Sequence, residues 1–145
     1  MASCYSDVYA RWQANPEAFW AEAARDVEWI KAPAKIFDAD IGIYGRWFPD
    51  ASLNACFNLL DRHVRDGRGD QVAIIHDSPL QGFSKRITYA ELLHEVETLA
   101  AVLIGHGVTK GDRVLLYMPM IPEALVGMYA CARIGAIHSL SLIHI

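Results

Sequence analysis

Apolar residues recur at helical spacing in two stretches of the chain. One stretch begins at Thr88-Tyr89-Ala90-Glu91, whose Thr and Glu spacing is that of a capping box, in which each side chain satisfies a backbone N–H at a helix start. The other begins after Ser52, which we expect to cap that helix. The predicted buried stripes are Cys56, Leu59, Leu60, His63 and Val64 in the earlier helix, and Leu92, Val96, Leu99, Ala100 and Leu103 in the later one.

Short apolar runs between these helices and after them predict strands. Residues 71–76 form one such run, and residues 85–87 are its expected antiparallel partner. Residues 114–118 are continuously apolar, which is typical of a strand with both faces covered.

The last third of the chain opens a strand–helix–strand unit. Its helix, residues 124–134, is apolar almost all round and must therefore be surrounded by protein. Residues 136–138 begin a second strand close to the end of the chain. Because parallel strands require neighbours and covering helices, the sequence predicts an α/β sheet that is truncated here. We expect the isolated chain to be marginally stable or to aggregate.

The first 50 residues are rich in aromatic side chains. Asn15-Pro16-Glu17 predicts a helix start, Pro33 is the expected end of that helix, and residues 35–49 are expected to be irregular or in short strands. So many aromatic side chains need a surface that buries them. We expect them to pack on the sheet domain that follows, and a partner-binding surface is the alternative.

Composition narrows the classes of partner and compartment. Seventeen acidic against 13 basic residues give a net charge of -4 without a basic stripe, so nucleic acid and anionic membranes are not expected partners. Three scattered cysteines, Cys4, Cys56 and Cys131, suggest a reducing compartment, and the last two are expected in the core. With neither a secretory signal nor an apolar run of spanning length, we expect a cytoplasmic protein.

The sequence predicts no catalytic, cofactor-binding or metal-binding residue. It contains no Walker loop, no G-x-G-x-x-G after a strand and no H-E-x-x-H, and Gly67-Arg68-Gly69 is weaker than any of these. His63 has no second ligand at metal spacing. His138 and Ser139 are adjacent on a strand and point to opposite faces. Ligands of open α/β sheets bind beyond the carboxyl ends of strands, here at Tyr117-Met118-Pro119 and after His138.

Several motifs together resemble one enzyme family. From about Tyr5 to Ser139 the chain is similar to the N-terminal part of the short-chain acyl-CoA synthetases, the AMP-forming acetyl- and propionyl-CoA ligases of the adenylate-forming superfamily. The motifs are Asn15-Pro16-Glu17-Ala18-Phe19-Trp20, Arg46-Trp47-Phe48, Leu60-Asp61-Arg62-His63, Ile87-Thr88-Tyr89-Ala90-Glu91-Leu92, Lys110-Gly111-Asp112-Arg113-Val114, Tyr117-Met118-Pro119-Met120, and residues 130–139.

The resemblance implies a fold and a domain organisation. The fold class is α/β: the start of the large N-terminal domain of an adenylate-forming enzyme, a mixed sheet with covering helices. Residues 1–65 would be the aromatic-rich helical arm and residues 66–139 the beginning of the AMP-binding domain. Residues 140–145 depart from the family pattern, and we expect an incomplete gene product.

The resemblance also implies a reaction. The family activates a carboxylate with ATP and Mg²⁺ to an acyl-adenylate, from which the thiol of CoA displaces AMP. Arg46-Trp47-Phe48 and Met120-Ile121 look closer to the propionate than to the acetate branch. Neither Lys85 nor Lys110 matches the family's catalytic lysine motif, so we expect this chain to bind none of the cofactors well and to be inactive alone.

The sequence is also compatible with other functions. A homo-oligomer is possible for the full-length enzyme. The chain is alternatively a truncated paralogue that acts as a non-catalytic binding module for a full-length ligase subunit. A complete small nucleotide-binding domain is the least favoured alternative, because no phosphate-binding loop is present.

Overall fold

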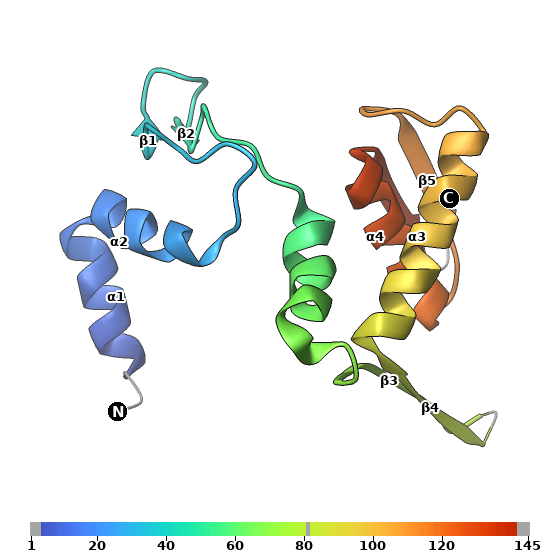
Figure 1. Cartoon of the computed structure of the whole chain (residues 1–145). Coiled ribbons are helices and arrows are strands. Elements are labelled where there is room, and N and C mark those ends of the chain that lie inside the picture. Colours follow the sequence, from blue (N-terminus) through green and yellow to red (C-terminus); the bar gives the residue numbers. More distant parts are fainter. Residues whose placement is uncertain (1–3, 81, 142–145) are drawn as a thin grey trace. The chain divides into compact units, whose positions relative to one another are not determined.

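The computed structural model describes residues 4–80 and 82–141 of the chain (Figure 1). The chain divides into two compact units, Met1–Leu53 and Asn54–Ile145. The expected boundary at residue 65 between an arm and a sheet domain remains a prediction.

The first unit begins with two helices, α1 (Tyr5–Ala14) and α2 (Pro16–Ala23). Asn15 caps α2 as predicted, since its Oδ1 accepts a hydrogen bond from the Ala18 N–H at 3.0 Å. Helix α1 was not predicted, because it has no side-chain cap and buries none of its residues, which leaves little periodic signal.

A 3₁₀ turn, η1 (Ala24–Asp26), ends the second helix well before the expected stop at Pro33. Two short antiparallel strands follow, β1 (Phe37–Asp38) and β2 (Arg46–Trp47), in agreement with the short strands expected there. Ser52 does not cap a helix: its N–H donates to the Lys31 carbonyl at 3.0 Å in an isolated antiparallel bridge.

The second unit starts with a helical stretch that contains the π-helical segment η2 (Phe57–Asp61) and a second segment, η3 (Val64–Arg68), which is kinked at Asp66 and Gly67. Its cap is Asn54, whose Oδ1 accepts from the Phe57 N–H at 3.1 Å. Serine and asparagine are comparable caps, so the sequence did not decide between Ser52 and Asn54.

The stripe predicted for this stretch is partly wrong. Cys56 and Leu60 are fully buried, but Leu59 is 50% exposed and Asp61, expected on the solvent side, is turned inward. A π-helical turn contains more residues than an α-helical turn. Each residue therefore advances by less than the about 100° that an α-helical stripe assumes.

A β-hairpin follows, made of β3 (Val72–Ser78) and β4 (Phe83–Thr88). The strands pair antiparallel, and the register shifts between Val72 and Ile74. The predicted hairpin is confirmed.

Helix α3 (Tyr89–Gly105) has both ends predicted by the sequence. The Glu91 N–H donates to Thr88 Oγ1 at 3.2 Å, and the Thr88 N–H donates to Glu91 Oε2 at 2.8 Å, which completes the capping box. At the other end Gly107 has φ +85°, and the Val108 N–H donates to the Leu103 carbonyl at 3.0 Å.

The chain then forms β5 (Arg113–Tyr117), α4 (Pro122–Ile134) and β6 (Ile137–Ser141). Strands β5 and β6 are parallel, and α4 connects them, as predicted (Figure 1). Of the tail 140–145, the first two residues continue β6, and residues 142–145 lie outside the described residues.

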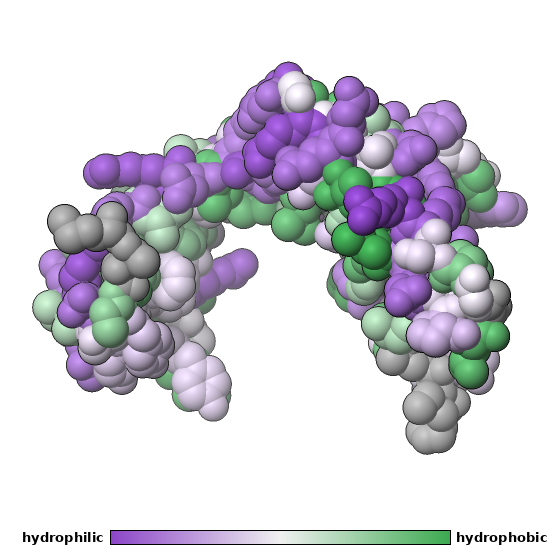
Figure 2. Space-filling model, turned by 90° about the horizontal axis from the view of Figure 1, so that it is seen from below, coloured by the Kyte–Doolittle hydropathy of each residue, from purple (hydrophilic) through white to green (hydrophobic). Residues whose placement is uncertain are grey.

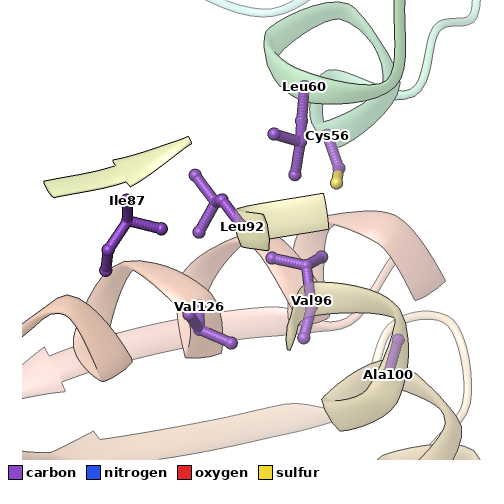
Figure 3. Packing of buried hydrophobic residues seen from close by; sticks show 8 residues of the cluster. Cys56, Leu60, Ile87, Leu92, Val96, Ala100 and Val126 are labelled. Carbon is purple, nitrogen blue, oxygen red and sulfur yellow. The ribbon is translucent and has the colours of Figure 1, made fainter. Parts of the chain in front are cut away.

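The core of the second unit lies where α3, α4 and the first helical stretch meet, with β4 alongside (Figure 3). Helix α4 is described throughout, and Glu123 is its one exposed residue. Six of its residues are buried, whereas Leu125 and Met128 line a hollow, so the expectation that this helix is surrounded by protein is met in part. The core residues are Cys56, Leu60, Ile87, Leu92, Val96, Ala100, Val126 and Ala130.

We expected β5 to be covered on both faces. Within the described part of the chain, only one of its faces is covered. Leu116 is 7% exposed, and its side chain lies so close to Gly127 of α4 that an added Cβ there would meet it at 3.1 Å. Leu115 and Tyr117 point the other way and are 52% and 60% exposed. Figure 2 shows hydrophobic residues exposed among hydrophilic ones on the face that it draws.

Candidate functional site

The carboxyl ends of β5 and β6 lie together, at the place where the sequence predicted a ligand to bind. The Met118 N–H, just after β5, donates to the Ser141 carbonyl at the end of β6, at 3.3 Å. Next to them is a hollow of about 220 Å³ between β3, the connection from β5 to α4, α4 itself and the end of β6. Its lining is Ile74, Ile75, His76, Met120, Ile121, Pro122, Ala124, Leu125, Met128 and Leu140.

This hollow suits an apolar group and does not suit a phosphate. His76 is the one titratable residue of the lining, and none of the described residues that line it is a lysine, arginine, aspartate or glutamate. Phosphate sites need cationic side chains or converging backbone N–H groups. The described lining of the hollow therefore offers no cationic side chain to the phosphates of ATP.

The described part of the chain contains no group of three or more His, Cys, Asp or Glu side chains that could hold a metal ion. A set of carboxylates for the Mg²⁺ that the resemblance implies is thus not formed by residues 4–80 and 82–141.

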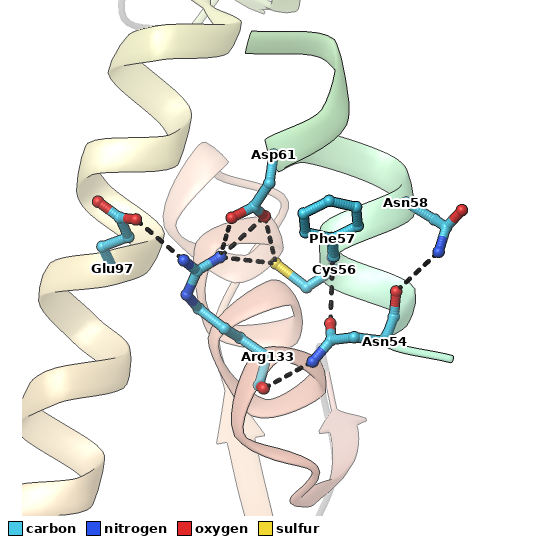
Figure 4. Close-up of polar contacts among 7 residues, drawn as sticks. All are labelled: Asn54, Cys56, Phe57, Asn58, Asp61, Glu97 and Arg133. Carbon is cyan, nitrogen blue, oxygen red and sulfur yellow. Dashed lines mark hydrogen bonds and ion pairs between the residues drawn. The ribbon is translucent and has the colours of Figure 1, made fainter. Parts of the chain in front are cut away.

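A polar cluster around Arg133 joins three helical elements of the second unit (Figure 4). Arg133 Nη1 donates to Asp61 Oδ1 and Oδ2 at 2.7 and 2.8 Å, and Nη2 donates to Glu97 Oε1 at 2.9 Å. The side chains of Arg133 and Asp61 are 27% and 17% exposed. The cluster therefore links α4 to η2 and α3 in partial shelter from solvent.

The thiol of Cys56 lies at the edge of this cluster. Its Sγ is 3.9 Å from Arg133 Nη1 and 3.9 Å from an Asp61 oxygen. Burial raises the pKa of Cys56, and the Arg133 guanidinium only partly opposes this. For Arg133, burial lowers the pKa, but the hydrogen bonds with Asp61 and Cys56 outweigh it and the pKa is raised. The raised pKa favours the protonated thiol, which is the less nucleophilic form.

The Asn54 side chain joins the first helical stretch to the end of α4. While Oδ1 caps the helix, Nδ2 donates to the Arg133 carbonyl at 2.9 Å, and the Asn54 carbonyl accepts from Asn58 Nδ2 at 3.1 Å. The cluster was missed from the sequence, which placed Asp61 and Glu97 on solvent-facing sides. The apolar surroundings of Arg133 near the end of α4 are the signal that points to a partner for it.

The other residues singled out from the sequence do not come together. His138 and Ser139 are exposed on β6, opposite Val114 and Leu115. Lys85 lies across the hairpin from His76, and the Lys110 side chain lies against Gly135. Cys4 is exposed, whereas Cys56 and Cys131 are buried as predicted.

The first unit contains a second apolar hollow, of about 280 Å³, between α1 and α2. Tyr5 stacks on Tyr9 at a centroid distance of 5.9 Å, and Tyr9 contacts Trp12 at 5.5 Å. Rings elsewhere in this unit also pack on one another: Trp47 lies 4.7 Å from Phe37. The expectation that these rings pack on the sheet domain remains a prediction.

The second unit is an α/β arrangement in which a hairpin and two helices accompany a parallel strand–helix–strand unit. Two family models match the chain almost end to end: the acetyl-coenzyme A synthetase N-terminus over residues 5–59 and the AMP-binding enzyme over residues 60–141. The second covers more than half of the chain. The chain belongs to the AMP-binding enzyme family.

Individual relatives agree with this assignment. The chain is 48% identical over 136 residues to the acyl-CoA synthetase short-chain family member 3, mitochondrial, of Bos taurus, which covers 94% of this chain and 20% of that protein. It is 46% identical over 138 residues to an acetyl-coenzyme A synthetase of Streptomyces coelicolor. That alignment covers 95% of this chain and 21% of the Streptomyces protein. The resemblance read from the sequence motifs is confirmed.

A solved structure supports the fold. The acetoacetyl-CoA synthetase from Streptomyces lividans matches with a TM-score of 0.84 and 29% identity, over 97% of this chain and 22% of that one. The predicted fold class is confirmed. The chain spans about a fifth of the length of the relatives it matches. No helix among the described residues is long and apolar enough to cross a bilayer.

Proposed function

We propose that this chain forms the N-terminal part of an acid–CoA ligase that forms AMP. The observation that carries the proposal is the unbroken match to the acetyl-coenzyme A synthetase N-terminus and the AMP-binding enzyme along residues 5–141. In this reaction a carboxylate oxygen attacks the α-phosphorus of ATP and pyrophosphate leaves. The thiol of CoA then attacks the acyl carbon, and AMP leaves.

The substrate is a short-chain carboxylate, acetate or propionate, with ATP, CoA and Mg²⁺ as the remaining components. The propionate branch is favoured by Arg46-Trp47-Phe48 and Met120-Ile121. We propose the cytoplasm as the compartment, although relatives named as mitochondrial share nearly half of the residues. A homo-oligomer remains part of the proposal, and nucleic acid and membranes are not proposed partners.

The residues of this chain have a supporting part in that reaction. Arg133 and Asn54 hold the end of α4, from which β6 runs to the edge of the sheet where ligands of such folds bind. The chain by itself is proposed to be inactive, because none of its sequence motifs matches the phosphate-binding loop or the catalytic lysine that adenylation in this family needs. The alternative of a non-catalytic binding module has no support in the comparisons.

A chimera tests the proposal. The segment of the Streptomyces coelicolor acetyl-coenzyme A synthetase that aligns with residues 5–139 is replaced by those residues of this chain. We expect the chimera to catalyse carboxylate-dependent exchange of pyrophosphate into ATP. A chimera that is folded and monodisperse but shows no exchange would contradict the proposal.

A further inference from the structure

His63 lies between η2 and η3, where its ring contacts two other parts of the second unit. His63 Nδ1 is hydrogen-bonded to Arg68 Nη2, and the ring packs edge-on against Tyr89 of α3 at a centroid distance of 5.2 Å. A guanidinium has only donors. His63 must therefore accept through an unprotonated Nδ1, so this hydrogen bond exists only while the imidazole is neutral.

The charged groups around His63 oppose its protonation. Burial is the largest cause that lowers the pKa of His63, and the Arg68 and Arg62 guanidiniums lower it further. Asp66 acts in the opposite direction. Tyr89, from the packed helix α3, contributes a ring and no carboxylate. A protonated His63 would thus face two guanidiniums and one carboxylate.

Arg68 is the last residue of η3 and adjoins the turn that leads to β3. Its carbonyl accepts from the Gln71 N–H at 3.1 Å, and the neighbouring Gly69 carbonyl accepts from the Ala90 N–H at 3.0 Å. These bonds connect the turn to the beginning of the hairpin and to the first turn of α3. The hydrogen bond between Arg68 and His63 connects it to the preceding helical stretch.

We propose that His63 and Arg68 form a proton-operated latch on the turn between η3 and β3. Neutral His63 accepts the hydrogen bond and holds the turn closed. Protonation at Nδ1 replaces the acceptor with a donor and places a positive charge beside the guanidinium, so the bond is lost and the turn opens. The latch is closed at neutral pH and opens reversibly as the pH falls through the pKa of His63. It does not depend on the proposed ligase reaction.

Hydrogen exchange of the whole chain, measured by mass spectrometry in dilute solution, tests the latch. The two conditions are about pH 7.5 and a lower pH at which NMR shows the His63 ring to be protonated, because the pKa of His63 lies below the ordinary histidine value of about 6.5. After correction for intrinsic exchange rates, we expect the peptide that covers residues 66–71 to lose protection several-fold at the lower pH. A peptide from the middle of α3 serves as the internal control and should not change.

Two variants separate the latch from general acid loosening. In His63→Gln the amide oxygen can accept from Arg68 at either pH, so protection of residues 66–71 should not depend on pH. In Arg68→Gln the pKa of His63, followed by NMR, should rise towards its ordinary value. Equal protection of the natural chain at both pH values, acid loosening that persists in His63→Gln, or an unchanged pKa of His63 in Arg68→Gln would each overturn the proposal.

Discussion

Arg133 and Asp61 lie 72 positions apart in the sequence, and their side chains meet at 2.7 Å. This pair, extended by Glu97, joins α4 to η2 and α3. Both partners are mostly shielded from solvent, so the pair is screened less than an exposed one.

Replacing Arg133 by methionine should destabilise the second unit. The change keeps the aliphatic stem but removes charge-assisted hydrogen bonds to two carboxylates and leaves Asp61 without this partner. The expected loss is about 2 kcal/mol in the free energy of unfolding, measured by urea denaturation. Arg113→Met is the control, because Arg113 is exposed, and its expected effect is under about 0.5 kcal/mol. If the two variants lowered the free energy of unfolding equally, the cluster around Arg133 would not stabilise the second unit more than an exposed arginine does.

The capping box of α3 should respond to acid. The backbone N–H of Thr88, and then its hydroxyl, hydrogen-bond to the Glu91 carboxylate and lower the pKa of Glu91. A lowered folded-state pKa gives stability that is present above the unfolded value and is lost as the pH falls through the folded value. We therefore expect the first turn of α3 to fray below about pH 4.5.

Hydrogen exchange at the Thr88 and Glu91 amides, measured by NMR across the acid range, follows this fraying. Glu91→Gln should remove the pH dependence, because its amide oxygen can still accept from the Thr88 N–H but no carboxylate is left to protonate. Thr88→Ala, which removes the other half of the capping box, should cost about 1 kcal/mol at neutral pH. If the acid loss persists unchanged in Glu91→Gln, the capping box is not its cause.

Replacement by alanine should change the stability of the protein in opposite directions at two glycines. At Gly127 an added Cβ would meet Leu116 Cδ2 at 3.1 Å, so Gly127→Ala forces the close contact between α4 and β5 apart. We expect a loss of about 1 kcal/mol or more. At Gly105, near the end of α3, an added Cβ meets nothing within 4 Å, and alanine should stabilise by about 0.5–1 kcal/mol. Thermal unfolding of both variants measures the contrast, and a stabilising Gly127→Ala would contradict the packing described here.

The exposed face of β5 and β6 should make the chain self-associate. Leu115, Tyr117 and Ile137 are more than half exposed on paired strands. Such apolar faces promote association. The double variant Leu115→Thr, Tyr117→Thr should lower the concentration-dependent light scattering of the chain while its unfolding midpoint stays nearly unchanged, since threonine keeps β propensity. Leu116→Thr, on the buried face, should instead lower the midpoint.

The sequence predicted those features whose signals are local. The capping box of Thr88 and Glu91, the stop at Gly107 and the strand–helix–strand unit all depend on neighbouring residues, and all are present in the structure. The apolar surface of α4 also predicted that this helix is mostly sheltered, with Glu123 as its one exposed residue.

The features that were missed depend on distant contacts or on unusual helical geometry. Asn54 was passed over for Ser52 because its second role, holding the Arg133 carbonyl, involves a residue far along the chain. Asp61 was placed towards solvent because the periodicity of an α-helix does not apply to π-helical turns. Of the candidate site, the position at the strand ends was predictable, but its apolar character comes partly from β3, whose place beside α4 the sequence does not show.

The central claim is that residues 5–139 are a working N-terminal part of an acid–CoA ligase. It is tested most directly by the initial rate of pyrophosphate exchange into ATP, with acetate or propionate, catalysed by the chimera that carries these residues. The account predicts carboxylate-dependent exchange by the chimera and none by the isolated chain. A folded chimera without exchange, or exchange by the isolated chain, would contradict it.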